Sequence, residues 1–442
     1  MLIKNLLLGI VLVISAVAAV EITEDTVVSG TINLGIGQIT IDPNVYYSIW
    51  NNAISAFTGS INVGEGGGLY ISSNSNLVGL SVTLLGVINS VTNDGIISLN
   101  SVQSLTAPNY NIIGLYFTNN GQIFMGGDGS VGTPYMAIAS SNFDNEGLMT
   151  FYQNTKSTGT VVLGGGLGVL SSITNNGDIC FYNEIYHQTS KIAGNGCIHI
   201  LASSTVILDT PLASIDTDQV IYMESPDSEL LTSTVTAVQP YTIAGFGNGN
   251  FIGINTPILS WKYDSTTGML TIYGGPFNTL PQKFNIGLGY NTADFDIVSH
   301  IFPGLSAPLN NAIVYNAPPP NPAPSNCHAC EMIPVAPPPT SSSTIASSSA
   351  SPSSSAAASS SVAPSSSAAA SSSAAPSSSA APSSSAAASS SAAASSSAAP
   401  SSSAAPSSSA APSSSAAPSS SVAPSSSAAP SSSAAQSSSA AP

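Results

Sequence analysis

Arginine is absent from this chain of 442 residues, and the five basic residues are all lysines. Against them stand 21 acidic residues, the last of which is Glu331, so the formal net charge is −16. Proteins contact nucleic-acid phosphates with lysine and arginine, and anionic membranes attract the same side chains. The composition therefore predicts no nucleic-acid partner and no binding to anionic membranes, and we interpret the acidity as a source of solubility.

Long apolar runs are missing beyond the amino terminus. Residues 6–14 are apolar apart from Gly9, Lys4 precedes them, and small residues follow at 15–19. This run is too short for a stable bilayer-spanning helix and has the layout of a secretory signal peptide. We expect residues 1–19 to be removed, which leaves an extracellular protein with no membrane insertion.

A hydrophobic carboxyl-terminal tail is also missing, since the chain ends Ser439–Pro442. A lipid-anchor signal needs such a tail after small residues. The protein is therefore released, or held at the cell surface in another way, or the sequence stops short of its natural end. No Asn-x-Ser/Thr acceptor occurs, so N-glycosylation is not predicted.

The last quarter of the chain is low in complexity. A proline-rich bridge spans residues 317–339, and Ser-Ser-Ser-Ala-Ala-Pro and its variants repeat from about residue 340. Such a segment has no large apolar side chains to offset the entropy of ordering, and Ser/Thr with Pro is typical of O-glycosylated stalks. We predict a disordered, O-glycosylated stalk over residues 332–442.

Residues 20–205 repeat a β pattern, in which short runs of Val, Ile, Thr, Leu and Phe alternate with Asn-Gly or Asp-Gly turns. The turn glycines are Gly95, Gly121, Gly147, Gly177 and Gly196. The first three are 26 residues apart, and the next gaps are 30 and 19. A period of roughly 20 to 30 residues without a helix signal indicates a solenoid.

Each repeat would form one coil of a parallel β-helix, with Ile, Val, Leu and Phe inside and Asn or Gly at the corners, where positive φ is tolerated. Asparagines at the same point of successive coils could stack into a hydrogen-bonded ladder. An antiparallel β-sandwich is the competing interpretation, because Asn-Gly is also a hairpin signal. The regular spacing favours the solenoid.

Residues 206–331 differ in character, because the Asn-Gly signature stops. We expect antiparallel strands at 204–208, 219–223, 258–263, 268–273 and 283–288, with a hairpin from Trp261 to Tyr273. These strands would form a small β-sandwich that caps the solenoid, since the last coil otherwise exposes a strand edge.

The four cysteines are Cys180, Cys197, Cys327 and Cys330, and an even number in a secreted chain suggests two disulfides. Three pairings are possible. A 327–330 bond would form a redox motif, but no thioredoxin-like pattern surrounds it, and a four-cysteine zinc site has passable spacing. We favour two bonds between the pairs, which would attach the segment after the cap to the solenoid.

The other candidate site residues favour structural roles. The histidines at 187, 199, 300 and 328 show no metal-ligand spacing, so we predict isolated surface or turn residues and no metal or cofactor. No Asp-Asp pair occurs, and we interpret Asp216 and Asp218, two residues apart, as part of a solvated loop. No Lys-Ser/Thr follows Gly164–Gly168, so this run predicts a solenoid turn, and Gly245–Asn250 predicts a flexible loop.

An aromatic group at Tyr46, Tyr47 and Trp50 could form a sugar-binding face. We favour an amino-terminal cap over the first coil, and we assign no catalytic residue.

The chain resembles the amino-terminal domain family of hyphally regulated cell wall proteins of yeasts and their adhesin-like relatives. The residues that carry the resemblance are Asn176–Cys180, Gly194–Ile198, Trp261–Asp264, Thr267–Leu270, Phe284–Tyr290 and Cys327–Cys330. The resemblance implies a right-handed β-helix followed by an α-crystallin-like β-sandwich, and an adhesion or surface role. It also implies a stalk that ends in a lipid-anchor signal, and this sequence departs there.

These observations predict a secreted or wall-associated monomer whose non-catalytic head adheres to cell-wall polysaccharide, or to host and abiotic surfaces. One alternative is a β-helix enzyme acting on polysaccharide. Lyases of that type need a basic residue and calcium-binding acids, and hydrolases need clustered acids, so the chain offers few candidates. Another alternative is a purely structural wall component.

Overall fold

The computed structural model describes residues 19–30, 32–75, 77–84, 88–165, 172–210, 213–234, 240–275, 280–305 and 310–338. Most of the expected signal peptide and of the expected stalk lies outside these residues. The described part is all-β, as predicted, with one short 3-10 helix, η1 (Thr292–Asp294). Within it, no helix is long and apolar enough to cross a membrane.

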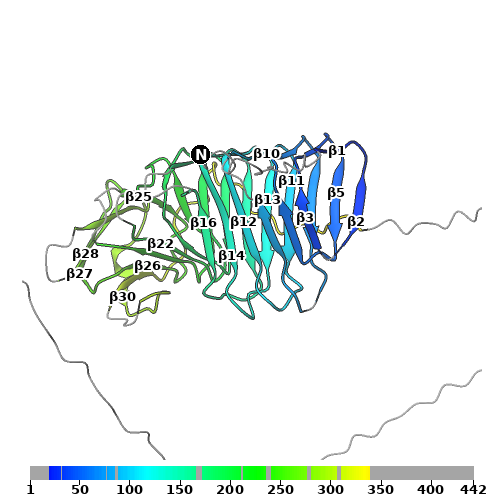
Figure 1. Ribbon diagram of the computed structural model, residues 1–442. Coiled ribbons are helices and arrows are strands. Elements are labelled where there is room, and N and C mark those ends of the chain that lie inside the picture. Colours follow the sequence, from blue (N-terminus) through cyan, green and yellow to red (C-terminus); the bar gives the residue numbers. More distant parts are fainter. Residues whose placement is uncertain are drawn as a thin grey trace, which may run out of the picture. The chain divides into compact units, whose positions relative to one another are not determined.

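Parallel pairing between successive coils produces three ladders (Figure 1). The first ladder contains β2 (Thr26–Ser29), β5 (Tyr46–Trp50), β8 (Gly68–Ser72), β11 (Ile96–Ser101), β13 (Gln122–Gly127), β15 (Leu148–Gln153), β18 (Asp178–Tyr182), β21 (Cys197–Ile200), β23 (Val220–Met223), β25 (Pro240–Ala244) and β29 (Gln282–Asn285). The second contains β3 (Ile32–Ile36), β6 (Ile54–Phe57), β9 (Ser81–Leu84), β12 (Asn109–Asn119), β14 (Tyr135–Asn145), β16 (Thr160–Leu163), β19 (Ile185–His187), β22 (Thr205–Leu208), β24 (Glu229–Thr232) and β26 (Phe251–Ile254).

The third ladder is shorter and merges with the second. It begins with β1 (Val20–Ile22), β4 (Ile39–Ile41), β7 (Ile61–Val63) and β10 (Ser90–Asn93), and it ends with β17 (Ser172–Asn175) and β20 (Lys191–Ala193). Between them, β12 and β14 are 11 residues long and serve both ladders. The chain visits the three ladders in turn, so the predicted solenoid is confirmed.

The core is built from inward-facing side chains that stack from coil to coil. Strand alternation sends every second side chain inward, and the parallel register then places like positions over one another. One column runs through Ile71, Leu99, Met125, Phe151 and Phe181. Each is at most 1% exposed, and burial of such a side chain contributes about 1.5–3 kcal/mol. The hydrophobic core is therefore continuous along the solenoid.

Four buried asparagines form the predicted hydrogen-bonded ladder at one corner of the coils. Asn93, Asn119 and Asn145 each donate from Nδ2 to the Oδ1 of the next asparagine, at 2.7 Å, and the last acceptor is Asn175. All four side chains are 0% exposed. Because an amide both donates and accepts, a stack of amides at this spacing can satisfy itself without water.

Two residues after each asparagine, a glycine permits the close contact between coils. A Cβ on Gly147 would lie 2.0 Å from the carbonyl oxygen of Gly121, and one on Gly121 would lie 2.1 Å from that of Gly95. No side chain fits at that distance, so the repeated Asn-x-Gly sequence follows from coil spacing at this corner.

Parallel pairing continues beyond the expected boundary at residue 205. The prediction of antiparallel strands at 204–208 and 219–223 is wrong, because β22 and β23 pair in parallel with both neighbours. In the next coil Gly194 lies in register with Asn175, so the ladder asparagine is missing there. Gln219, from the coil after that, supplies the hydrogen bond instead: its Oε1 accepts from Asn175 Nδ2 at 3.0 Å. A longer amide thus continues the ladder without the expected sequence pattern.

Antiparallel strands follow the last coils. The predicted hairpin is confirmed: β27 (Ile258–Asp264) pairs with β28 (Met269–Gly274), which pairs with β29. On the other side, β30 (Phe295–Val298) pairs with β31 (Ala312–Tyr315), and β31 pairs with β26. Aromatic rings fill the space between them, with Phe295 4.9 Å from both Trp261 and Tyr315 between ring centroids. The edges of β25 and β26 are therefore paired.

Replacement of Asn119 by alanine should destabilise the protein strongly. The change removes the 2.7 Å bond from Asn93 Nδ2, which keeps only the carbonyl oxygens of Gly95 and Gln122 as acceptors, and it leaves Asn145 Oδ1 without a donor. An unpaired buried group costs about 1–3 kcal/mol, and the lost side chain also leaves a gap in the column. We expect urea denaturation of Asn119→Ala to show a free energy of unfolding lower by about 2–4 kcal/mol.

The matched control is Asn120→Ala at the next residue. Asn120 is exposed and donates to Asp94 Oδ1 at 2.6 Å on the surface. Its loss should cost less than about 0.5 kcal/mol. Equal effects of the two substitutions would contradict a stabilising role for the ladder.

Candidate functional site

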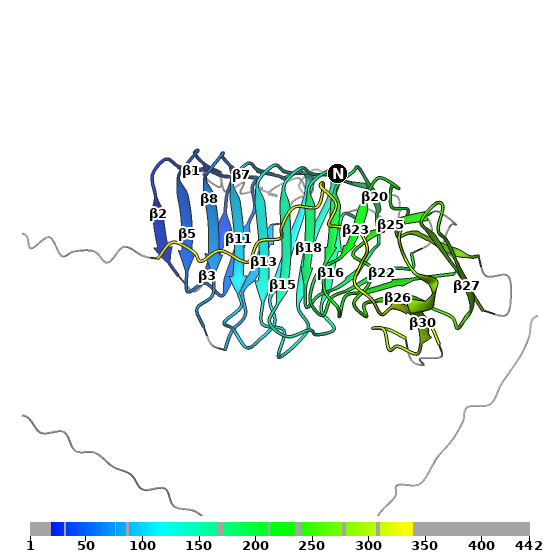
Figure 2. The ribbon, with the colours of Figure 1, turned by 180° about the vertical axis from the view of Figure 1, so that it is seen from behind.

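The last described residues, 326–338, cross the outer face of the first ladder and run back toward the first coils (Figure 2). We call this segment the strap. At one end, Asn326 Nδ2 donates to the carbonyl oxygen of Asn195 at 2.8 Å. At the other end, Trp50 Nε1 donates to the carbonyl oxygen of Pro337 at 2.5 Å. The strap therefore links the later coils to the second strand of the first ladder.

Apolar outward-facing side chains hold the middle of the strap. Ile333 packs against a buried cluster that includes Phe124 and Leu148. It also lies over Gly126, where an added Cβ would be 1.8 Å from Ile333 Cδ1. Residues 332–338, which the predicted stalk includes, lie instead against the solenoid, where Ile333 packs on an apolar surface and Ala336 is buried.

Two disulfides fasten the strap to β18 and β21. Cys180 is bonded to Cys330 and Cys197 to Cys327, with Cα–Cα distances of 6.0 and 5.1 Å. This is the inter-segment arrangement favoured above. His199 lies close to both pairs of sulfurs, but sulfurs joined in disulfides are not thiolates and offer no zinc ligands.

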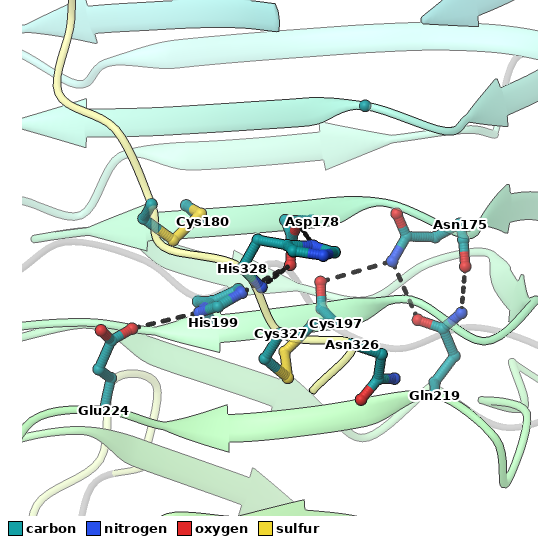
Figure 3. Close-up of polar contacts among 12 residues, drawn as sticks. Asn175, Asp178, Cys180, Cys197, His199, Gln219, Glu224, Asn326, Cys327 and His328 are labelled. Atoms are coloured by element: carbon teal, nitrogen blue, oxygen red, sulfur yellow. Dashed lines mark hydrogen bonds and ion pairs between the residues drawn. A yellow bond between two sulfur atoms is a disulfide. The ribbon is translucent and has the colours of Figure 1, made fainter. Parts of the chain in front are cut away.

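A charged cluster lies beside the disulfides (Figure 3). Asp178 contacts His199 Nε2 at 2.9 Å through Oδ1 and His328 Nδ1 at 2.9 Å through Oδ2. The His328 backbone N–H also donates to Asp178 Oδ1 at 3.1 Å. On the other side, His199 Nδ1 lies 3.2 Å from Glu224 Oε2. His199 is 1% exposed, so this imidazole is buried between two carboxylates.

The two central groups stabilise each other's charged forms. Burial raises the pKa of the Asp178 carboxyl, but hydrogen bonds from His199 and His328 outweigh it and place the pKa below its usual value. Burial lowers the pKa of His199, whereas hydrogen bonds and charge from Asp178 and Glu224 raise it above its usual value. The cluster thus favours the charged form of the His199 imidazole. The prediction that His199 is an isolated surface residue is wrong, because it is buried between two carboxylates.

The arrangement of the cluster serves to attach the strap to the solenoid rather than to transfer protons. Both ring nitrogens of His199 contact carboxylates, so neither is free to take a proton from a hydroxyl or thiol nucleophile. Asp178 in turn uses both oxygens on the two histidines. Figure 3 also shows Gln219, the end of the amide ladder, bonded to Asn175 three residues before Asp178. The strap is therefore fixed at the point where the regular ladder ends.

The remaining sequence candidates lie apart from this cluster. Asp216 and Asp218 are exposed, and the Asp218 N–H donates to Asp216 Oδ1 at 3.3 Å in a surface turn. The glycines from 166 to 168 lie outside the described residues. Between β25 and β26, the buried Asn250 holds the turn, since its Oδ1 accepts from Gly247 N–H at 2.9 Å.

Two more histidines are also paired with acids. His187 contacts Asp209 at the surface, and His300 Nε2 lies 2.9 Å from Glu229 Oε1 while its ring stacks on Phe251. Sequence spacing did not indicate these contacts, because each partner comes from a different coil or from the antiparallel strands.

The aromatic group at 46–50 lies on β5, and its members differ in role. Tyr47 packs against the core, whereas Trp50 faces the strap.

Comparisons with known proteins identify relatives. Residues 10–337 match the family described as "Hyphally regulated cell wall protein N-terminal". The chain is 42% identical over 342 residues to Hyphally regulated cell wall protein 3 of Candida albicans, an alignment that covers 76% of this chain and 27% of the relative. It is 39% identical over 357 residues to Cell wall protein IFF6 of the same organism, with 79% of this chain and 32% of the relative covered.

A third relative is Cell wall protein RBR3 of Candida albicans, 40% identical over 335 residues, with 74% of this chain and 21% of the relative covered. The chain thus spans about a third or less of the length of these three relatives.

The pKa directions predict how the cluster's contribution to stability depends on pH. Because the pKa of Asp178 is lowered on folding, its contribution is complete above the unfolded value of about 3.9 and is lost as pH falls through the folded pKa. Because the pKa of His199 is raised, its contribution is complete below about 6.5 and is lost as pH rises through the folded pKa. The cluster should stabilise most between about pH 4 and 6.5.

We therefore expect His199→Gln to lower the melting temperature by about 3–6 °C near pH 5 and by less near pH 9, since the contribution of His199 is lost as pH rises through its folded pKa. Thermal unfolding at both pH values measures this difference. His187→Gln, at an exposed acid pair, is the matched control and should change little at either pH. A larger effect of His199→Gln at high pH would contradict the assignment.

The disulfides should contribute much of the stability of the folded region that the structure describes. They close loops of 150 and 130 residues, and each such bond contributes about 2–4 kcal/mol. Substitution of all four cysteines by alanine should therefore lower the free energy of unfolding in urea by about 4–8 kcal/mol.

Added reductant is the control, since it should destabilise the parent protein and leave the four-alanine variant unchanged. Equal stability of parent and variant without reductant would show that the strap is held by non-covalent contacts alone.

Proposed function

The chain belongs to the hyphally regulated cell wall protein family, and on this premise we propose that it is an adhesin-like, non-catalytic protein of the fungal cell wall. The observation that carries the proposal is the match to cell wall proteins across nearly the whole described region. The relatives' names place them in the cell wall, so this chain acts outside the cell.

The proposed architecture has a head and a stalk. Residues 1–19 are a signal peptide that is removed on secretion. The parallel coils form a right-handed β-helix, and the antiparallel strands β27–β31 form an α-crystallin-like β-sandwich that caps it. A disordered Ser/Ala/Pro stalk with O-linked glycans follows the strap. The capped edges of β25 and β26 support this arrangement, since an open edge would pair with other chains.

A non-catalytic role agrees with the chemistry of the strap cluster. Its imidazole and its carboxylates are occupied by one another and by the strap, and the exposed acidic pair at 216 and 218 lies in a turn. On the second ladder the head instead presents uncharged polar side chains, such as Ser81 and Thr83 of β9 and Asn109 and Asn111 of β12. Its partners in this proposal are cell-wall polysaccharide, or host and abiotic surfaces, and it works as a monomer.

Cell-surface display tests the adhesive role. The full mature chain, fused to a heterologous wall anchor on a non-adherent yeast, should raise adherence several-fold to plastic, to other yeast cells or to epithelial cells. The matched control is the same anchor carrying residues 339–442 alone, which should give no gain. A folded, exposed head without any gain in adherence would contradict the adhesive role and leave a structural wall component.

A further inference from the structure

A groove lies between the strap and the loops that follow β8 and β11. Its volume is about 360 Å³, within the range of small-molecule sites. Four of its lining residues belong to one outward-facing row of the first ladder: Trp50, Ser72, Asn100 and Tyr152. Gly126 lies in the same row between Asn100 and Tyr152, and Ile333 of the strap covers it. The groove is thus built on rigid, paired strands.

The walls of the groove carry no charge. The strap contributes apolar side chains such as Met332 and Ala336, and the opposite loops contribute amides at Asn74 and Gln103. Of the described residues that line it, none is acidic, basic or histidine, although the chain as a whole carries a net charge of −16. An uncharged groove on a strongly acidic protein fits a neutral ligand.

One lining residue has an unmet hydrogen-bonding requirement. Ser72 is 5% exposed, and its Oγ has no hydrogen-bond partner among the described residues. A buried hydroxyl without a partner is unfavourable, whereas a ligand hydroxyl placed in the groove would satisfy it. Ser72 lies on β8, and the neighbouring strands β5 and β11 carry the hydrogen-bonding side chains of Trp50 and Asn100.

Two aromatic side chains lie at the two ends of this row of lining residues. Trp50 and Tyr152 are four strand steps apart, which is roughly 19 Å at the usual strand spacing. Aromatic rings present flat apolar faces, which match the C–H faces of sugar rings. Amides both donate and accept, as sugar hydroxyls do. The span suits a short oligosaccharide better than a single sugar.

We propose that this groove binds a neutral oligosaccharide. Trp50 and Tyr152 stack on sugar rings, and Ser72 bonds to a sugar hydroxyl. The amides of Asn100 and Gln103 bind further hydroxyls along the row. The proposal deepens the adhesive role and rests on it, because it names the class of ligand that the head recognises. An apolar peptide is the rival occupant, since the strap side of the groove is apolar.

Tryptophan fluorescence of the full chain provides the test. The chain contains two tryptophans, so Trp261→Phe leaves Trp50 as the single reporter. Laminaritetraose, mannotetraose and chitotetraose are titrated separately, with the apolar tetrapeptide Leu-Val-Ala-Leu as the comparison. We expect a saturable change in Trp50 emission with at least one tetrasaccharide and none with the peptide.

A second substitution separates binding from folding, because loss of Trp50 would also loosen the strap. Ser72→Ala should weaken saccharide binding by about tenfold, while the melting temperature stays equal or rises, since an unpartnered buried hydroxyl is removed. Ser141→Ala on β14, away from the strap, is the matched control and should bind like the parent.

The outcomes are distinct. Absence of a response to all three tetrasaccharides at millimolar concentration, equal binding by Ser72→Ala and parent, or a response to the peptide alone would each overturn the proposal. Adherence of displayed cells without saccharide binding would remove the groove assignment and keep the adhesive role. Saccharide binding without adherence would keep the groove and remove the adhesive role.

Discussion

The hydrogen bonds between paired strands fix the distance from one coil to the next. The residues at every corner of the solenoid must fit within that distance. At the asparagine corner, the backbone of one glycine nearly touches that of the next, so no larger residue fits at Gly121 or Gly147. The same spacing brings successive amides within hydrogen-bonding distance. The repeated Asn-x-Gly sequence, the continuous core column and the long ladders all follow from this constraint.

That constraint also explains what was predictable from the sequence. Because the corner residues recur at regular intervals, the solenoid and its asparagine ladder were visible in the spacing of Gly95, Gly121 and Gly147. The hairpin at Trp261–Tyr273 was visible for a similar local reason. The later parallel coils were missed because Gly194 occupies the ladder position of the coil after Asn175, and the hydrogen bond to Asn175 comes from Gln219 in the coil beyond, so the sequence pattern ends there.

The strap and its cluster could be predicted only in part. Counting the cysteines indicated two disulfides, and bonds between the two pairs were favoured, but which cysteine of one pair bonds which of the other did not follow from the sequence. The contact of Asp178 with His199 and His328 joins residues from two coils and a segment 150 positions away. No periodic signal connects such positions. The available clue is the alternation of two neighbouring strands, which places Asp178 and Cys180 on the outer face of β18 and Cys197 and His199 on the outer face of β21.

The direction of the strap determines how the head bears mechanical load. The strap runs opposite to the order of the coils, so the chain continues from Pro338 beside Trp50, far from the cap. Tension on that continuing chain would first break the contacts at Pro337 and Ile333. The covalent bond between Cys330 and Cys180 would then carry the force. The later coils and the antiparallel strands lie outside this path, so their fold can remain intact while the tether is under strain.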